Sequence, residues 1–237
     1  MEETHPGSQQ KEVSSGLNMG KTILTKTQKE ILNDLSKDKD FTSNFYFTGG
    51  TALSEFYLQH RLSEDLDFFS EKEIDDLWLV TLAKNLKTCL NADKVDIQKS
   101  FNRNLVFLTV EGNTVKTEFT YYPFEHIQKP KKIKGLKVDS LVDLAVNKFF
   151  TIYQKPSARH FIDLYLILEK GAVPWESLFK LARKKFDTVI DPLQLGTSLF
   201  QAKQISDLPK MIIKLEEKSW RDFFYSRALE LKPTIEQ

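Results

Sequence analysis

Two aspartates separated by one residue, Asp65 and Asp67, follow the adjacent glycines Gly49 and Gly50 in the chain. The segment around Leu66 reads as a strand, in which side chains alternate, so both carboxylates point to one face. Two carboxylates on one face repel each other unless a cation lies between them. A hard divalent ion such as Mg²⁺ suits this pattern because it prefers oxygen ligands and retains water for a phosphate group.

A third acid is expected on a neighbouring strand. In the expected strand 114–121 the apolar Val115 and Phe119 share one face, which places Lys116, Glu118 and Thr120 on the other. Glu118 is therefore a candidate third metal ligand or a general base toward an acceptor hydroxyl. Three carboxylates can hold two metal ions that clamp the attacking and leaving oxygens of an in-line displacement.

The glycine pair fits the same chemistry. Gly49 and Gly50 allow a tight turn between a short aromatic strand and a helix, and a close approach to a ligand. The start of the helix from Thr51 then offers free N–H groups to phosphates, and Thr51 adds a hydroxyl donor. Ser63, just before the aspartates, either braces this loop and the nucleotide or is a simple cap. The pattern predicts transfer of a nucleotidyl or phosphoryl group from a triphosphate.

The elements that position these residues change character along the chain. We expect residues 1–20 to be a flexible tail and residues 21–134 to form an α/β domain. Periodicity and turn residues predict helices over 23–35, 51–60 and 74–90 and strands over 45–47, 66–69, 95–99, 104–110 and 114–121. A connector bracketed by Pro123 and Pro130 follows, and strand signals then stop. Residues 135–237 are expected to be a helical domain, with helices over 139–153, 159–169, 174–186, 192–204 and 220–231.

Composition narrows the class of protein. The chain has 237 residues, 41% of them hydrophobic, and a net charge of +1. These values indicate a globular protein, and no apolar run is long enough to span a bilayer. Its single cysteine, Cys89, excludes an internal disulfide and is expected to be buried in a helix. We therefore expect a cytoplasmic protein without a membrane partner.

Three blocks together resemble a known family. They are GGTAL at 49–53, RLSEDLDFF at 61–69, and LVDLAVNKFF at 141–150 with ARHFIDLYLIL at 158–168. Gly-Gly, fourteen residues and Asp-x-Asp resemble the signature of the polymerase-β-type nucleotidyltransferase superfamily. The three blocks in this order resemble the AbiEii-like, MenT-related nucleotidyltransferase toxins.

The resemblance implies an α+β fold, in which a polymerase-β-type core with a small mixed sheet precedes a C-terminal helical domain. It implies Mg²⁺-dependent transfer of a nucleotide from an NTP, with the tRNA acceptor end as a target class. It also implies a toxin of a type IV toxin–antitoxin or phage-defence pair, and hence a cognate antitoxin. Carried onto matching positions, it implies these site residues: Gly49 and Gly50 for the triphosphate, Asp65 and Asp67 for metal, Lys148 and Arg159 for phosphate, and Asp163 completing the site.

Some alternatives stay open. The acceptor could instead be a small molecule or a protein side chain. His160 stands where many relatives have an acid, so a non-catalytic member that binds RNA or a partner is another possibility. Asp163 could be structural, paired with Arg159 at helical spacing. The connector carries a lysine cluster that is either simply solvated or contacts RNA: Lys129, Lys131, Lys132, Lys134 and Lys137.

Overall fold

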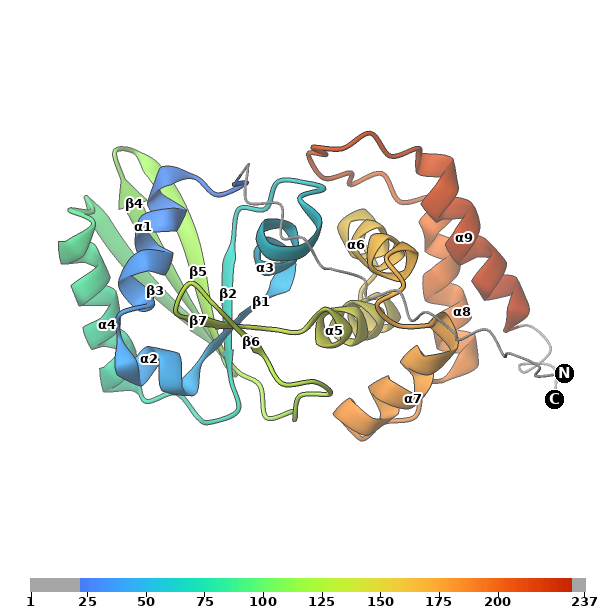
Figure 1. Ribbon diagram of the computed structural model, residues 1–237, viewed down its shortest axis with the longest axis horizontal. Coiled ribbons are helices and arrows are strands. Elements are labelled where there is room, and N and C mark those ends of the chain that lie inside the picture. Colours follow the sequence, from blue (N-terminus) through green and yellow to red (C-terminus); the bar gives the residue numbers. More distant parts are fainter. Residues whose placement is uncertain (1–21, 232–237) are drawn as a thin grey trace, which may run out of the picture.

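The computed structural model describes residues 22–231, so the expected tail over 1–20 lies outside the described residues. Figure 1 shows two bodies side by side, a sheet with helices on one of its faces and a group of helices that follows it in the chain. Within the described part, no helix combines the length and apolarity needed to cross a membrane.

The first body is built on one mixed, seven-stranded sheet with the order β3-β4-β5-β2-β1-β7-β6. Its central strands, β1, β2 and β5, are those that carry the candidate site. Strand β2 pairs antiparallel with β1 and parallel with β5. The strands are β1 (Tyr46–Thr48), β2 (Leu66–Ser70), β3 (Lys94–Ser100), β4 (Arg103–Val110), β5 (Asn113–Tyr121), β6 (Lys131–Ile133) and β7 (Leu136–Val138).

Helices cover one face of this sheet. They are α1 (Lys26–Leu35), α2 (Lys39–Asn44) and α4 (Asp76–Cys89). Their apolar residues pack with Phe68 and Phe119 of β2 and β5 into one buried cluster. Polar N-caps define where these helices begin: Thr25 forms a capping box with Gln28, and Asp75 accepts a hydrogen bond at the start of α4. The opposite face of β2 and β5 is left for the carboxylates.

The glycine pair begins a short helix, α3 (Gly49–Leu53), which continues as a π-helical turn over Ser54–Leu58. The turn ends at Gln59 in the left-handed conformation. Leu53 belongs to the core of the second body. This element therefore joins the sheet to the helices.

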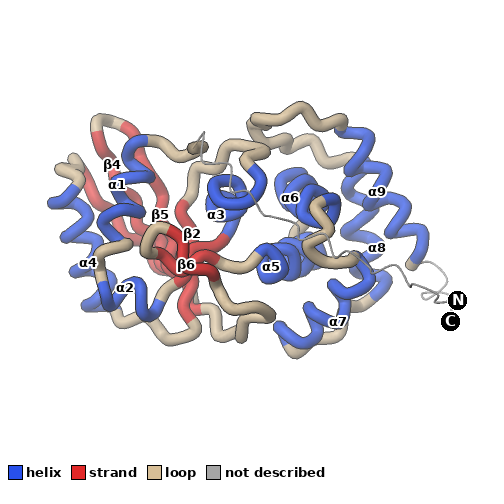
Figure 2. Tube along the Cα trace, in the orientation of Figure 1, coloured by secondary structure: helices blue, strands red, loops and turns tan. Residues whose placement is uncertain are grey.

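The second body is helical within the described residues. Figure 2 draws this part of the described chain as helices and loops, without strands. Its helices are α5 (Leu141–Gln154), α6 (Ala158–Glu169), α7 (Trp175–Phe186), α8 (Pro192–Phe200), a 3₁₀ turn (Gln201–Lys203) and α9 (Glu217–Glu230). They enclose a second core around Phe149, Phe161, Trp220 and Phe224. The α+β fold class is thus confirmed.

The sequence-based description missed two elements, α2 and the hairpin β6–β7. The hairpin lies in the lysine-rich connector, and the boundary predicted at residue 134 falls in its turn. Strand β7 pairs parallel with β1 through Phe47 and Val138, so the sheet continues to Val138. The signal was the alternation of lysine with apolar residues around Lys134 and Gly135, both of which have positive φ.

A segment of the helical body returns to the sheet body. The amide of Ile212 donates to the carbonyl of His60 at 2.8 Å, and the amide of Leu62 donates to the carbonyl of Lys210 at 2.8 Å. Arg61 and Met211 form the bridge between these bonds. We refer to residues 208–213 as the strap, because they hold the loop before β2 against the helical body.

Candidate active site

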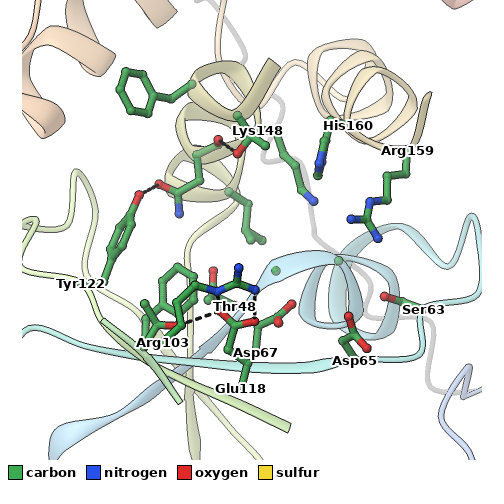
Figure 3. Close-up of a pocket in the computed structure, with 18 of the residues that line it drawn as sticks. Thr48, Ser63, Asp65, Asp67, Arg103, Glu118, Tyr122, Lys148, Arg159 and His160 are labelled. Carbon is green, nitrogen blue, oxygen red and sulfur yellow. Dashed lines mark hydrogen bonds and ion pairs between the residues drawn. The ribbon is translucent and has the colours of Figure 1, made fainter. Parts of the chain in front are cut away.

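A pocket of about 580 Å³ lies where the two bodies meet. The predicted carboxylates form one side, and basic residues from α5 and α6 form the other, as Figure 3 shows. Aromatic side chains line one end of the pocket: Phe69, Tyr122, Phe124, Phe150 and Phe186. The pocket therefore combines acidic, basic and aromatic surfaces.

The three acids lie together as strand alternation predicted. Asp67 is the register partner of Glu118 in the β2–β5 pair, and Asp65 precedes β2 on the same side. Burial, together with the charges of Glu118 and Asp65, raises the pKa of Asp67 to about 6. This pocket floor therefore holds a carboxylate that a cation would stabilise in its ionised form.

Two basic side chains already contact the acids. Lys116 Nζ lies 2.6 Å from Asp65 Oδ2. Arg103 donates to both oxygens of Glu118, at 2.7 and 2.6 Å. Burial alone would raise the pKa of Glu118, but the hydrogen bonds from Arg103 and Thr120 outweigh it and keep this pKa below its usual value. A general-base role for Glu118 is therefore less favourable than the sequence suggested.

Arg103 is the functional candidate that sequence reasoning missed. It begins β4, and its register partner on β5 is Thr120, two residues from Glu118 on the same face. Only the β4–β5 register brings the guanidinium to Glu118, although the hairpin around Gly112 was a signal for that pairing. The Arg103 side chain is 56% exposed, so it can leave Glu118 without unpacking a core.

The carboxylate oxygens favour a divalent cation held by Asp65 and Asp67 over one enclosed by three carboxylates. Among residues 22–231, no group of three or more acidic, histidine or cysteine side chains is arranged to hold a metal ion. Asp65 and Asp67 nevertheless supply hard oxygen donors beside one pocket, and Asp67 has a pKa raised by burial and by neighbouring negative charge. Such an environment suits Mg²⁺.

The glycine pair is required by close packing. Gly49 has a φ of +75°, and a Cβ atom there would overlap the Asp67 carboxylate. A Cβ atom on Gly50 would lie 2.5 Å from the Arg61 guanidinium and 3.0 Å from Ser63 Oγ. The two glycines thus let the backbone pass directly over Asp67, which places the turn beside the acids.

Replacing Gly49 with alanine should therefore destabilise the fold more than the same change at Gly112. Gly112 also has a positive φ, +74°, but open space around it. Each alanine costs about 1 kcal/mol for the left-handed conformation, and overlap with Asp67 adds about 1–3 kcal/mol at Gly49. Urea titrations of the wild type and of the two variants give the free energies of unfolding that measure both losses of stability. Equal losses would contradict the packing argument.

The predicted role of Thr51 is wrong. Its side chain is fully buried, and its hydroxyl donates to the backbone carbonyl of Asp65 instead of facing the pocket. Ser63 does line the pocket beside Gly50. Gln28 of α1, also buried, donates to the carbonyl of Glu64 at 2.9 Å. Thr51 and Gln28 thus fix the loop that presents Asp65.

Asp163 lies behind the basic side of the pocket, where it accepts four contacts. Arg61 donates to its two oxygens at 2.6 and 2.8 Å, His60 Nε2 lies at 2.8 Å, and Lys148 Nζ lies at 2.8 Å. Burial alone would raise the pKa of Asp163, but the charges of Lys148 and Arg61 hold it well below its usual range. Helical spacing suggested Arg159 as the partner of Asp163. The cations that contact it are instead Arg61, which precedes β2, and Lys148, on α5.

Lys148, Arg159 and His160 all line the pocket opposite the carboxylates (Figure 3). The ammonium group of Lys148 directs one N–H group to Asp163, and its other N–H groups can donate to a ligand. Burial and the nearby Lys148 charge lower the pKa of His160 to about 3, so its imidazole is neutral at physiological pH. His160 Nδ1 is buried without a hydrogen-bond partner among the described residues.

With this geometry in view, comparison with known proteins decides the family. The profile of the family described as nucleotidyl transferase AbiEii toxin, type IV TA system, matches residues 30–233. The chain belongs to the AbiEii family. The predictions of the family and of a nucleotidyltransferase enzyme are thereby confirmed, and the family implies an antitoxin partner and the use of a divalent metal.

Other proteins are similar to this AbiEii member. An uncharacterised protein of Aquifex aeolicus (strain VF5) is 29% identical over 170 residues, which cover 70% of this chain and 77% of that protein. Two solved structures from Helicobacter pylori share the fold. One is described as a nucleotidyltransferase (TM-score 0.58, 20% identity, 89% and 94% of the two chains covered), and the other is JHP933 (TM-score 0.55, 21% identity, 89% and 91% covered).

Two further sequence predictions have structural outcomes in this AbiEii protein. Cys89 is exposed, so its predicted burial is wrong. It ends α4, where Leu86 and Leu90 occupy the inward positions, and its thiol contacts Asp34 at 3.2 Å. The lysine cluster is exposed: Lys129 precedes the β6–β7 hairpin, and the other four lysines lie on it. Lys137 contacts the carbonyl of Ser43, at the end of β1 away from Gly49.

Proposed function

We propose that this protein transfers a nucleotide from an NTP to an RNA acceptor, such as the acceptor end of tRNA, as the toxin of a type IV toxin–antitoxin pair. The observation that carries the proposal is the single pocket in which Asp65 and Asp67 lie under the Gly49 turn and face Lys148 and Arg159. Acidic and basic groups facing each other across one pocket suit a metal-bound triphosphate.

Each side of the pocket has a role in this proposal. Asp65 and Asp67 would hold Mg²⁺, with Glu118 as a candidate third carboxylate. The metal would neutralise charge on the phosphates and activate the acceptor oxygen. Gly49, Gly50 and Ser63 would lie along the triphosphate, while Lys148 and Arg159 would bind its oxygens from the helical side. The aromatic end of the pocket offers a stacking surface for the nucleobase.

The reaction itself is a displacement at phosphorus. The acceptor hydroxyl oxygen forms a bond to the α-phosphorus of the NTP, the bond from that phosphorus to the bridging oxygen breaks, and pyrophosphate leaves. The hydroxyl proton passes to a base or to solvent. The protein contributes mainly by orienting the two reactants and by compensating charge. Because His160 is neutral, the positive charge on this side of the pocket comes from Lys148 and Arg159.

Incubation of the protein with each radiolabelled NTP and total tRNA tests this function. We expect label on tRNA in the presence of Mg²⁺, none with EDTA, and a loss of about 10²–10³-fold or more in Asp65→Ala. Parallel incubations contain small-molecule acceptors or lysate protein. Label only on those acceptors would contradict the RNA proposal, and NTP binding without any transfer would identify a non-catalytic member.

A further inference from the structure

A second cavity, of about 730 Å³, continues the active-site pocket past Asp65. The two cavities share seven lining residues, so they form one continuous depression: Arg61, Ser63, Asp65, Arg103, Thr151, Arg159 and His160. The second cavity extends between the start of α6 and the strap. We call it the basic groove, after the four exposed cations that line it in addition to the buried Arg61: Arg103, Lys155, Arg159 and Lys210.

Three of the four exposed cations of the basic groove have no ion-pair partner among the described residues, whereas Arg103 is paired with Glu118. Lys155, Arg159 and Lys210 are exposed, and within residues 22–231 their side chains form no ion pair. Three acids also line the groove: Glu64, Asp65 and Asp207. Asp65 is paired with Lys116, and Asp207 accepts the amide of Ala158 at 3.0 Å. Glu64 and Asp207 thus set two negative charges against the three unpaired cations, which leaves a local excess of one positive charge. In a chain with a net charge of +1, this local excess selects an anionic ligand.

The basic groove differs from the first cavity in the absence of aromatic rings. Its lining has no phenylalanine, tyrosine or tryptophan among the described residues, whereas the first cavity has five such side chains at one end. Stacking on nucleobases is therefore favoured in the first cavity and phosphate binding in the second. The volume of the groove, about 730 Å³, is that of a ligand pocket and is too small to enclose a double helix.

We propose that the basic groove binds the phosphate backbone of a single-stranded 3′ end and leads its terminal hydroxyl to Asp65 and Asp67. This inference rests on the proposed function, because it assigns the acceptor to one part of the same site. The NTP occupies the first cavity, and the acceptor enters from the strap side. Lys155, at the end of α5, and Lys210, in the strap, contact acceptor phosphates without recognising base sequence.

The double variant Lys155→Ala/Lys210→Ala tests the groove by binding alone. The probe is a fluorescent single-stranded RNA oligonucleotide with a free 3′ hydroxyl, titrated at several salt concentrations. We expect affinity to fall about tenfold and the slope of log K against log salt to decrease by about 1.4, which is two contacts at about 0.7 each. NTP affinity should stay unchanged.

A matched control is Lys84→Ala/Lys87→Ala, which removes the same charge from the exposed surface of α4. It should leave RNA affinity and salt slope as in the wild type. In transfer assays the groove variant should raise KM for the RNA acceptor and leave kcat and KM for NTP unchanged. These kinetic values separate acceptor binding from damage to the catalytic pocket.

The outcomes distinguish this inference from the proposed function. Loss of RNA affinity only in the groove variant supports the groove, even if the wild type transfers no nucleotide to RNA. Equal RNA affinity and slope in both variants overturns the groove, even if the enzyme labels tRNA. Equally tight binding of blunt duplex RNA, or the absence of RNA binding by the wild type, also overturns it.

Discussion

Replacing Asp67 with asparagine should abolish nucleotide transfer and stabilise the metal-free fold at neutral pH. Asparagine keeps the shape of the side chain but removes the charge that would bind Mg²⁺, so we expect transfer to fall by about 10²–10³-fold or more. Stability should change in the opposite direction. Burial and neighbouring acids raise the pKa of Asp67 from 3.8 to about 6, so ionising this carboxyl costs more in the folded chain than in the unfolded one.

The pH dependence of stability shows why Asp67→Asn should be more stable than the wild type at neutral pH. Below about pH 4 the carboxyl is protonated in both states, and the wild type carries no penalty. Between about pH 4 and 6 the unfolded chain releases the proton first, so wild-type stability falls, and the penalty then stays constant above pH 6. Relative to its value near pH 4, the free energy of unfolding of Asp67→Asn should exceed that of the wild type at pH 7 by about 1–3 kcal/mol.

Denaturant titrations in EDTA at several pH values, together with transfer assays in Mg²⁺, measure both effects. Asp96→Asn, on the edge strand β3, is the control, and it should change neither transfer nor the pH profile. A variant that keeps its transfer rate would remove Asp67 from the proposed site. A variant whose stability relative to the wild type does not rise between pH 4 and pH 7 would contradict the raised pKa of Asp67.

Replacing Asp163 with alanine should cost both stability and activity. The carboxylate is fully buried and contacts Arg61 and Lys148, whose side chains are also nearly buried. Removing it leaves two cations unpaired in the interior, which typically costs about 3–5 kcal/mol. Because Arg61 packs over Gly50 and Lys148 lines the pocket, both should shift, and KM for NTP should rise. Asp163 is thus a positioning residue, since it reaches the pocket through Arg61 and Lys148.

A second buried ion pair provides a control that separates the loss of stability in Asp163→Ala from its effect on NTP binding. Asp143 and Lys185 lie 2.7 Å apart, both fully buried, and neither lines the pocket. Asp143→Ala should destabilise the protein to a similar extent, measured by urea denaturation, but leave KM for NTP unchanged in the folded fraction. In addition, Lys148→Met should partly restore the stability of Asp163→Ala by removing one unpaired charge. An Asp163→Ala enzyme with wild-type KM would show that the carboxylate only supports folding.

The strand pattern predicted most of the acidic side of the pocket. Period-2 alternation placed Asp65, Asp67 and Glu118 on one face, and the parallel β2–β5 register confirms it. That register itself was not predictable, because α4, β3 and β4 separate the two strands in the chain. The partners of these acids depend on it, which is why the contact between Arg103 and Glu118 was missed.

The remaining errors have a common physical origin. Whether a hydroxyl such as that of Thr51 faces a ligand or the interior depends on which neighbours pack against it, and a local pattern does not contain that information. The same holds for Asp163, whose helical neighbour Arg159 suggested a local pair. Its actual partners include His60 and Arg61, more than 100 residues earlier in the chain. Contacts between distant segments are not encoded in spacing.

The strap is expected to limit the size of the acceptor in the proposed reaction. Residues 208–213 are hydrogen-bonded to residues 60–62 at the border of the site, while their other attachments are the 3₁₀ turn and α9 on the helical body. We therefore expect the number of residues between Lys203 and Glu217 to influence the width of the basic groove between α6 and the strap. Lengthening this link would admit bulkier acceptors, and shortening it would restrict them, with the triphosphate end of the pocket left as it is.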